Sequence, residues 1–242
     1  MKKKVKIKRE VKVLSLGGSL IIPNEINLDY LLNLKKILIK HSKNYKFVIT
    51  CGGGKIARIY IEALKKSKIN KLFQSFIGIS CTRTNARFMN YLFGLDSDKG
   101  IPHTTKSLIK GINKKDIVFC GALEYKPNQT SDSTAALLSK RFKTDFINLT
   151  NVKGLYDKDP SKNKNAKLIK EISWTDFDDI VNRMKFKPGQ HFVLDQNASK
   201  IIKESKIKTF ILGSDLKELD NLLNKKNFEG TTIGEFNGTT FY

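Results

Sequence analysis

Short apolar runs alternate with longer segments of helical periodicity along the chain. The runs at 11–16 and 47–50 each end in a cluster of glycines, and after each of them apolar residues recur every three or four positions. The order strand, glycine turn, helix thus occurs twice within the first 70 residues. In the first helix, which Asn27 is expected to cap, the inner face is predicted to consist of Leu28, Leu31, Leu32, Leu38 and Ile39. In the second helix the residues at helical spacing are Ile56, Ile59, Tyr60, Ala63 and Leu64.

The alternation continues toward the C-terminus. The pattern predicts further strands over 116–120, 145–149 and 208–212, with a final strand near 231–233. It predicts further helices over 82–93, 131–142, 175–184, 196–205 and 215–224. Strands separated by helices form right-handed βαβ units, so we expect a mostly parallel sheet with helices on both faces. Because no linker, repeat or low-complexity tract interrupts the pattern, one α/β domain is expected over 1–242.

The two glycine turns are candidates for phosphate binding. A parallel sheet binds its ligands at the carboxyl ends of its strands, which is where the turns at 17–19 and 52–54 lie. Glycine lets the backbone approach an oxyanion closely, and the helix that follows offers free N–H groups. Lys55 adds a positive charge to the second turn, and Arg58, one helical turn further, can form a bidentate pair with phosphate.

The sequence argues against several other kinds of functional site. The Walker pattern GxxxxGK[ST] is absent, and the second turn matches the dinucleotide fingerprint GxGxxA without the acidic residue that should follow within 68–80. His41, His103 and His191 are too far apart for a zinc motif. Cys51, beside the glycines, is interpreted as a small buried residue at a strand end rather than a nucleophile.

The composition indicates the cellular compartment and the class of ligand. No apolar run approaches the roughly 20 residues that span a bilayer, and three widely spaced cysteines without CxxC are typical of a reduced cytoplasmic protein. The net charge is +22, and residues 1–95 hold 20 basic against four acidic side chains. This balance favours anionic partners, but the lysines are scattered and no nucleic-acid module is present. Small phosphates are therefore preferred to nucleic acid, and no membrane association is expected.

Two later segments point to a nucleotide. Thr130-Ser131-Asp132-Ser133 begins a helix, so one of these residues caps it; Asp132 could also hold lysines or Mg²⁺ while its neighbours bind phosphate. The segment 150–160, TNVKGLYDKDP, follows a strand directly. A polar turn accounts for its glycine and its Asp-Pro step. Its Thr-Asn pair, followed by an aromatic residue and an aspartate, suits an adenine and ribose platform.

Together these segments resemble the amino acid kinase superfamily, and within it the archaeal-type uridylate (UMP) kinases. The resemblance covers almost the whole chain and lies in an ordered set of motifs: LGGSL, CGGGKIARIYIEA, FIGISCTRTNA, TSDSTAALLSK, TNVKGLYDKDPSKNKNAK, VLDQNASKIIKESKIKTFILG and EGTTI. It implies a three-layer αβα sandwich around a mainly parallel sheet of about eight strands, with an acceptor part over 1–142 and an ATP part over 143–242. It also implies a homohexamer that transfers the γ-phosphoryl group of ATP, with Mg²⁺ carried by ATP and not bound directly by the protein, to UMP in pyrimidine nucleotide synthesis.

The resemblance also implies residue roles. The residues expected to act on charge in catalysis are Lys55, Arg58 and Asp132. Those expected to bind ATP are Gly18, Ser19, Gly54, Arg58, Thr150, Asn151, Tyr156 and Asp159. Those expected to bind UMP are Gly53, Ser75, Glu124, Tyr125, Lys126, Pro127, Asn128, Gln129, Thr130 and Ser131.

Three positions depart from the superfamily pattern. Ser15 stands where many members have a lysine, as in archaeal-type members. Ser75 replaces an acidic residue that meets the acceptor ribose, and the loop at 122–129 replaces a Thr-His-Pro-Gly-His loop. The last two lie on the acceptor side, so a kinase for another small phosphate or carboxylate is an alternative. A non-catalytic nucleotide sensor, or a nucleic-acid-binding relative that uses the +22 charge, is a second alternative.

Overall fold

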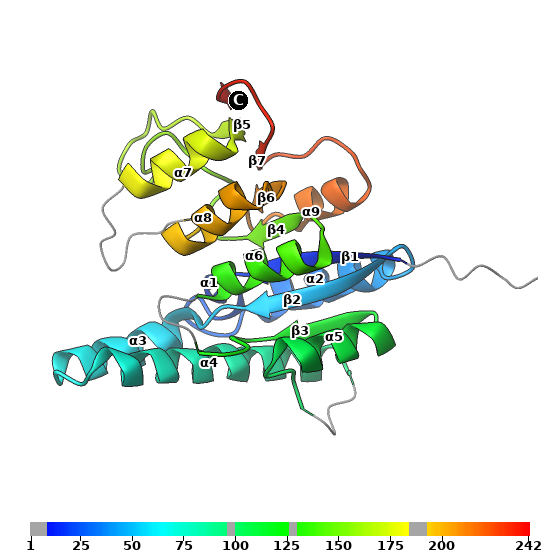
Figure 1. Cartoon of the computed structure of the whole chain (residues 1–242), viewed down its shortest axis with the longest axis vertical. Coiled ribbons are helices and arrows are strands. Elements are labelled where there is room, and N and C mark those ends of the chain that lie inside the picture. Colours follow the sequence, from blue (N-terminus) through cyan, green and yellow to red (C-terminus); the bar gives the residue numbers. More distant parts are fainter. Residues whose placement is uncertain (1–8, 96–99, 126–129, 184–192) are drawn as a thin grey trace, which may run out of the picture.

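The computed structural model describes residues 9–95, 100–125, 130–183 and 193–242. These residues form an eight-stranded sheet in the order β3-β2-β1-β4-β6-β7-β5-β8, which runs from bottom to top in Figure 1. The strands are β1 (Glu10–Leu16), β2 (Tyr45–Cys51), β3 (Ile117–Cys120), β4 (Phe146–Leu149), β5 (Ile169–Ser173), β6 (Thr209–Leu212), β7 (Thr231–Gly234) and β8 (Thr240–Phe241). β1, β2, β3, β4 and β6 are parallel, whereas β7 pairs antiparallel with β6 and β8 antiparallel with β5.

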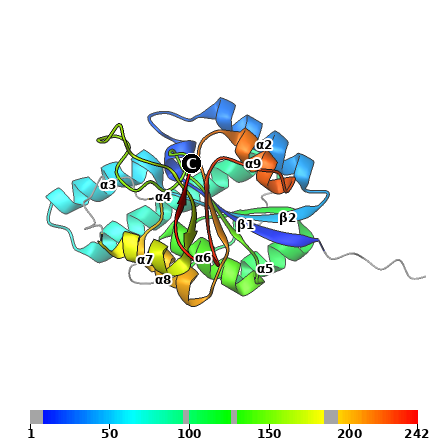
Figure 2. The same ribbon diagram turned by 90° about the horizontal axis from the view of Figure 1, so that it is seen from above.

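Helices cover both faces of this sheet (Figure 2). The core on one face includes side chains from α1 (Gly18–Ile21), α2 (Leu28–His41), α4 (Lys71–Leu92) and α9 (Leu216–Leu223). The core on the other face includes side chains from α5 (Thr105–Lys114), α6 (Ser131–Phe142), α7 (Trp174–Arg183) and α8 (Gln196–Glu204). The predicted three-layer αβα fold is therefore confirmed. β3 and β4 are buried along their whole length; β3 is entirely apolar, and the one polar residue of β4, Asn148, donates a hydrogen bond to the Val193 carbonyl.

The buried face of α2 differs from the predicted one. Leu31 and Leu38 are buried as expected, together with Tyr30, Leu34 and His41. Leu28 and Ile39 are 47% and 53% exposed, and Leu32 also faces solvent. Apolar residues extend around much of this helix, so periodicity alone leaves its orientation open. Contact with the sheet selects the stripe that contains Leu31, Leu34 and Leu38.

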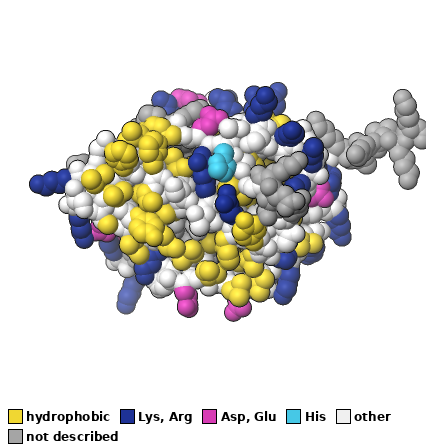
Figure 3. Space-filling model, turned by 90° about the horizontal axis from the view of Figure 1, so that it is seen from below, with side chains coloured by type: hydrophobic (Ala, Val, Ile, Leu, Met, Phe, Trp, Pro, Cys, Tyr) yellow, Lys and Arg dark blue, Asp and Glu magenta, His cyan; other side chains and the backbone are white. Residues whose placement is uncertain are grey.

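The helices α3 (Gly54–Lys66) and α4 form a hairpin that projects from the sheet. α4 begins at Lys71, eleven residues before the predicted start, and Asn70 caps it by accepting hydrogen bonds from the N–H groups of Leu72 and Phe73. Its first turns do not lie on the sheet, so they lack a simple apolar period. Hydrophobic side chains gather on the surface at this end of the molecule (Figure 3). They include Ile56, Ile59, Tyr60, Ile69, Leu72, Phe73 and Phe76, all of which are exposed.

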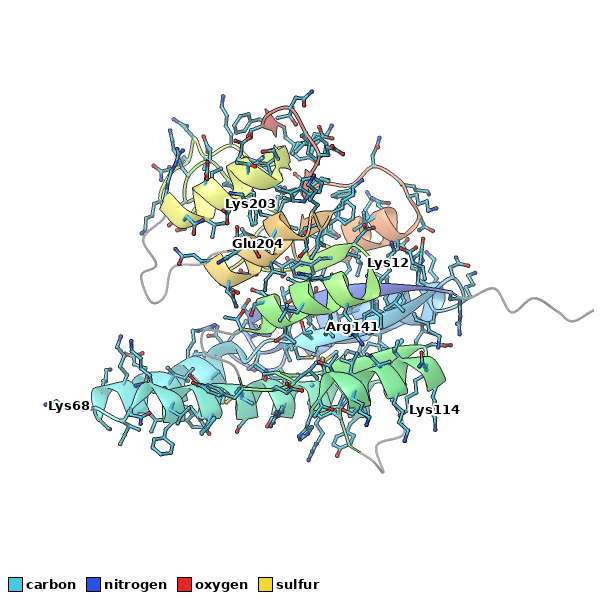
Figure 4. All side chains as sticks on the ribbon, in the orientation of Figure 1. Lys12, Lys68, Lys114, Arg141, Lys203 and Glu204 are labelled. Atoms are coloured by element: carbon cyan, nitrogen blue, oxygen red, sulfur yellow. The ribbon has the colours of Figure 1, made fainter. Side chains whose placement is uncertain are left out.

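A tight turn joins α3 to α4, and polar contacts join α7 to α8. Lys68, at the far tip of the α3–α4 hairpin (Figure 4), has a φ of 56° in the turn. In the upper part of Figure 4, Lys203 of α8 forms an ion pair with Asp178 of α7 at 2.9 Å. Asp178 also accepts a hydrogen bond from the Ser199 hydroxyl, so α7 and α8 are held together by a buried polar group that is satisfied.

Four elements were missed by the pattern: α1, α5, β5 and β8. α1 and β8 are too short for a periodic signal, and β8 follows the strand that the pattern placed last. α5 begins with a capping box between Thr104 and Ser107, but its lysines and glycine obscure the apolar side chains Leu108 and Ile112. No helix within the described ranges combines the length and the apolarity that crossing a bilayer requires.

Candidate active site

The two glycine turns lie against each other at the carboxyl edge of the sheet. A Cβ atom added to Gly18 would lie 2.0 Å from the backbone nitrogen of Gly54 and 2.9 Å from the carbonyl carbon of Gly52. Gly54 has a φ of 68°, and its own added Cβ would lie 2.7 Å from the Gly18 oxygen. Neither position can hold a side chain, so the sequence requires glycine at both turns.

Helices α1 and α3 begin at these turns. Their N-caps are Gly17 and Gly53, and neither forms a side-chain cap. The first N–H groups of a helix have no partner within the helix, so those of α3 are available to an anionic ligand beside the first turn. The glycine turns therefore form a surface of backbone N–H groups, which we call the floor of the site.

A third helix, α6, begins over the ends of β1 and β2. The Thr50 hydroxyl of β2 donates to the Ser131 carbonyl at 3.3 Å, and the Ser15 hydroxyl of β1 donates to Asp132 Oδ1 at 2.6 Å. Thr130 caps α6 in a capping box with Ser133. The prediction that one of residues 130–133 caps this helix is thus confirmed, with Thr130 as the cap, and Asp132 is joined to the end of β1.

The carboxyl group of Asp132 has an unusual electrostatic environment. Its burial and the negative charge of Asp195 raise the pKa of Asp132 to about 7, and the hydrogen bond from Ser15 opposes this shift. A carboxylate in this position becomes ionised more readily when a cation lies nearby. A pKa raised by burial and by a like charge is common at functional sites.

Asp195 is a site residue that the sequence analysis did not assign. It caps α8 by accepting hydrogen bonds from the N–H groups of Asn197 and Ala198, and its other oxygen accepts one from the Thr130 hydroxyl at 2.5 Å. The caps of α6 and α8 are therefore joined. The signal was present in the sequence, because Asp195 follows the apolar pair Val193-Leu194 and precedes a helical stretch.

A cavity of about 350 Å³ opens beside the second glycine turn. It is lined by α3, by α4 and by the chain between β3 and α6, and its lining residues are Gly53, Ala57, Ile61, Gln74, Ser75, Gly78, Ile79, Thr82, Ala122, Glu124, Tyr125, Thr130 and Ser131. Six residues predicted to bind UMP are among them: Gly53, Ser75, Glu124, Tyr125, Thr130 and Ser131. The other four, Lys126, Pro127, Asn128 and Gln129, lie outside the described residues.

The remaining residues of the floor are placed as follows. Gly18 is buried, and Ser19 is half-buried in the first turn of α1. Lys55 donates a hydrogen bond to Asn24 Oδ1 at 2.7 Å, which directs its ammonium group toward the chain between α1 and α2. Arg58 is exposed on α3, one turn after the glycines.

The residues predicted to bind the donor nucleotide follow β4. A Cβ added to Gly17 would lie 3.8 Å from Thr150 Cα, so the beginning of this segment touches the first glycine turn. Asn151 is exposed beside it, and half-buried Tyr156 pairs with Leu168 in an antiparallel bridge. Asp159 accepts hydrogen bonds from the N–H and the hydroxyl of Ser161, which lower the pKa of Asp159. Its carboxylate therefore stabilises a turn within the segment.

The alternative chemistries gain no support from the side chains concerned. Burial raises the pKa of the Cys51 thiol well above its ordinary value, so this cysteine stays protonated and is a poor nucleophile. His41 is buried against Asp220 between α2 and α9, far along the fold from the exposed His103 near α5. Among the described residues there is no group of three or more His, Cys, Asp or Glu side chains that could hold a metal ion.

Comparison with known proteins agrees with this geometry. A uridylate kinase of Thermococcus kodakarensis is 34% identical over 226 residues, which are 91% of this chain and 98% of that protein. A uridylate kinase of Thermoplasma volcanium is 36% identical over 224 residues, 92% of this chain and 97% of that protein. The crystal structure of uridylate kinase from Archaeoglobus fulgidus has a TM-score of 0.80 at 31% identity, and covers 93% of this chain and 100% of that one.

The model of the amino acid kinase family matches residues 10–213, which include the floor, the cavity beside the second glycine turn and the segment after β4. With that match and relatives of this similarity over nine-tenths of its length, the chain belongs to the amino acid kinase family.

Proposed function

We propose that this protein transfers the γ-phosphoryl group of ATP to UMP and forms UDP, as a uridylate kinase in pyrimidine nucleotide synthesis. The contact between the two glycine turns beside the acceptor cavity carries this proposal. A donor and an acceptor that both end in phosphate need one surface on which the phosphates can meet. The floor is such a surface, with the acceptor cavity on one side and the segment after β4 on the other.

The chemistry requires neutralisation of charge rather than a general base. An acceptor phosphate oxygen is already anionic, so catalysis consists of bringing two polyanions together and stabilising the charge that spreads in the transition state. The floor supplies backbone N–H groups through Gly18 and Gly54, and Arg58 and Lys55 supply positive charge. Asp132, linked to β1 by Ser15, would orient the cationic groups around the reacting phosphates.

ATP is proposed to carry Mg²⁺ into this site. The raised pKa of Asp132 fits this proposal, because a cation beside the carboxyl group would lower its pKa and keep it ionised when the nucleotide is bound. When bound, Mg²⁺ neutralises charge on the β- and γ-phosphates. We assign it no protein ligand.

The two nucleotides are proposed to bind in different halves of the chain. The acceptor would occupy the part formed by 1–142, in contact with Gly53, Ser75, Glu124, Tyr125, Lys126, Pro127, Asn128, Gln129, Thr130 and Ser131. ATP would occupy the part formed by 143–242 together with the floor, in contact with Gly18, Ser19, Gly54, Arg58, Thr150, Asn151, Tyr156 and Asp159.

The protein is further proposed to act as a cytoplasmic homohexamer. The exposed apolar side chains of α3 and α4 support self-association, because monomers rarely expose so many large apolar residues on one hairpin. Sedimentation or light scattering of the purified protein tests this assembly, and a monomer at micromolar concentration would rule it out.

A kinase with another acceptor is the second candidate. Because residue 75 is serine, this position of α4 offers the acceptor no carboxylate. The Ser75 hydroxyl donates instead to the Lys71 carbonyl of its own helix at 2.9 Å. The substrate can be identified by measuring ADP release with UMP, CMP, dUMP, isopentenyl phosphate and carbamate. We expect the highest kcat/KM with UMP, and UMP at background level would overturn the proposed substrate. No ADP release with any acceptor, together with salt-dependent RNA binding, would favour a non-catalytic protein.

A further inference from the structure

Polar side chains in the middle of α4 hold the backbone of two other segments. Asn85, which is buried, donates from Nδ2 to the Gly52 carbonyl at 2.7 Å and so fixes the second glycine turn. The Thr82 hydroxyl accepts a hydrogen bond from the N–H of Ala122 at 3.0 Å. Arg83 donates from Nε to the Ala122 carbonyl and from Nη2 to the Leu123 carbonyl, each at 3.0 Å.

These contacts depend on a close approach of the chain that leaves β3. A Cβ added to Gly121 would lie 2.6 Å from the Arg83 nitrogen and 2.6 Å from the Thr82 carbonyl carbon. Ala122 and Leu123 are 7% and 4% exposed, so their carbonyl groups have little access to water. Buried carbonyls without partners are costly, and Arg83 satisfies two of them with one side chain.

The segment that Arg83 holds leads directly into the acceptor cavity. Ala122, Glu124 and Tyr125 line the cavity, and so does Thr82 from α4. The Tyr125 ring packs edge-on against Phe76 of α4, with 5.3 Å between ring centroids. Arg83 is not among the described lining residues, so any effect it has on the acceptor passes through the segment 122–125.

We propose that Arg83 is a positioning residue for the acceptor: its guanidinium group fixes the carbonyls of Ala122 and Leu123 and thereby sets the shape of the UMP cavity. This inference rests on the proposed function and goes beyond it, because it assigns a role to a residue that does not line the cavity. A guanidinium group suits the task, since its planar donors reach two carbonyls at once, whereas lysine is a single point donor.

The chain provides a matched control one helical turn further along α4. Arg87 is exposed and has no hydrogen bond or ion pair with the described part of the chain. Burial and the positive charges of Arg83 and Arg87 lower the pKa of His103, so both arginines contribute to the same local field. Removing Arg87 therefore changes the local charge in the same way without removing the contacts to 122–123.

The test compares Arg83→Met, Arg83→Lys and Arg87→Met by steady-state kinetics with UMP and ATP. We expect Arg83→Met to raise KM for UMP about tenfold or more and to change KM for ATP less than twofold. The KM for UMP of Arg83→Lys should lie between the values for Arg83→Met and for the unchanged protein. Arg87→Met should change neither the KM for UMP nor the KM for ATP more than twofold. Equal effects of Arg83→Met and Arg87→Met would show that charge alone matters, and equal increases in the KM for UMP and for ATP would show a general loss of structure. Either result overturns the proposal.

Hydrogen exchange at the backbone amides gives a readout that needs no substrate. In the unliganded protein, Arg83→Met should increase exchange at 122–125 at least several-fold, and Arg87→Met should leave it unchanged. Unchanged exchange at 122–125 in both variants would overturn the positioning role. If Arg83→Met does not fold, Arg83→Lys carries the same comparison. A protein that does not phosphorylate UMP but shows this exchange difference would contradict the proposed function and leave the positioning role of Arg83 supported.

Discussion

The floor of the site and the wall of the acceptor cavity differ in the contacts that mainly hold them in place. The floor consists of two backbone turns in direct contact, with glycine at 18 and 54 because no side chain fits between them. The acceptor wall, by which we mean the middle of α4 and the segment 121–125, is joined by side-chain hydrogen bonds: Thr82 accepts one from the Ala122 N–H, and Arg83 donates to the Ala122 and Leu123 carbonyls. Gly18 and Gly54 should therefore tolerate no substitution, whereas changes to the wall side chains Thr82 and Arg83 should have graded effects that fall mainly on one substrate.

The largest effect is expected for Gly54→Ala, with Gly94→Ala as its control. The two glycines have nearly the same φ, 68° and 66°, but a Cβ at Gly94 has no atom within 4 Å. Gly94→Ala should therefore lower the free energy of unfolding by the backbone strain alone, which is about 1–2 kcal/mol. Gly54→Ala also forces a Cβ against the Gly18 backbone and should cost about 2–3 kcal/mol more and abolish turnover. Urea unfolding of both variants measures the difference, and equal losses would contradict the close packing of the floor.

Asp132→Asn should separate activity from stability. The amide cannot provide negative charge to orient the cationic groups, so kcat should fall about 10²–10³-fold. The folded-state pKa of about 7 lies above the ordinary value of 3.8, so the folded protein binds the proton more tightly than the unfolded chain. The free energy of unfolding of the unsubstituted protein should therefore decrease as pH rises from about 4 to about 7. Above that range the ionisation of Asp132 should cause no further decrease.

The substitution removes this titration from the stability profile. Asp132→Asn should be more stable than the unsubstituted protein by about 1–2 kcal/mol at pH 8. This is less than the full pKa shift implies, because Asp132 is partly accessible and the hydrogen bond from Ser15 is weaker to a neutral amide oxygen than to a carboxylate. At pH 5 the difference should be small. Activity should change in the opposite direction, and kcat/KM for ATP in the unsubstituted protein should rise as Asp132 ionises near pH 7. The opposite result would be a stability difference between Asp132→Asn and the unsubstituted protein that becomes less favourable to the variant from pH 5 to pH 8. That result would show that the Asp132 carboxyl stabilises the fold when it is charged.

Arg58→Ala should reduce activity without affecting the fold. Its side chain is exposed on α3 and forms no hydrogen bond or ion pair with the described residues, so the free energy of unfolding should change by less than about 0.5 kcal/mol. Loss of a cation from the reacting phosphates should lower kcat/KM about 10²-fold or more. Lys65→Ala, at another exposed position of α3, is the control and should leave kinetics unchanged. Equal kinetics in the two variants would remove Arg58 from the site.

The same contrast explains what could be predicted from the sequence. Glycine has a local signature, so the turns that form the floor could be recognised, and the alternation of strands and helices predicted the confirmed αβα fold. The cap of α6 follows from the same local rules, whereas the contact between Asp132 and Ser15 of β1 depends on tertiary packing. The buried face of α2 was predicted only in part, with Leu31 and Leu38 correct, because apolar residues surround much of that helix and only the sheet selects one stripe.

The contacts of the acceptor wall could not be predicted in the same way. Thr82 and Arg83 are ordinary polar residues of a helix, and their partners lie about 40 residues further along the chain. The link between Thr130 and Asp195 spans 65 residues and likewise depends on the packing of α6 against α8. Helical periodicity has no information about which backbone group a polar side chain will meet. The family resemblance supplied residue roles on both sides of the site, and these roles remain predictions.

The smallest effect is expected for Ser75→Ala, in the acceptor wall. Ser75 lines the cavity, but its hydroxyl already donates to the Lys71 carbonyl within α4. A serine that bonds to its own helix in this way has no second proton to donate to a ribose, although its oxygen can still accept a hydrogen bond. KM for UMP should therefore rise at most two- to threefold, with kcat and the preference for UMP over dUMP unchanged. An increase of tenfold or more would mean that the hydroxyl binds the acceptor directly, and the wall would then recognise UMP through this side chain as well as through its shape.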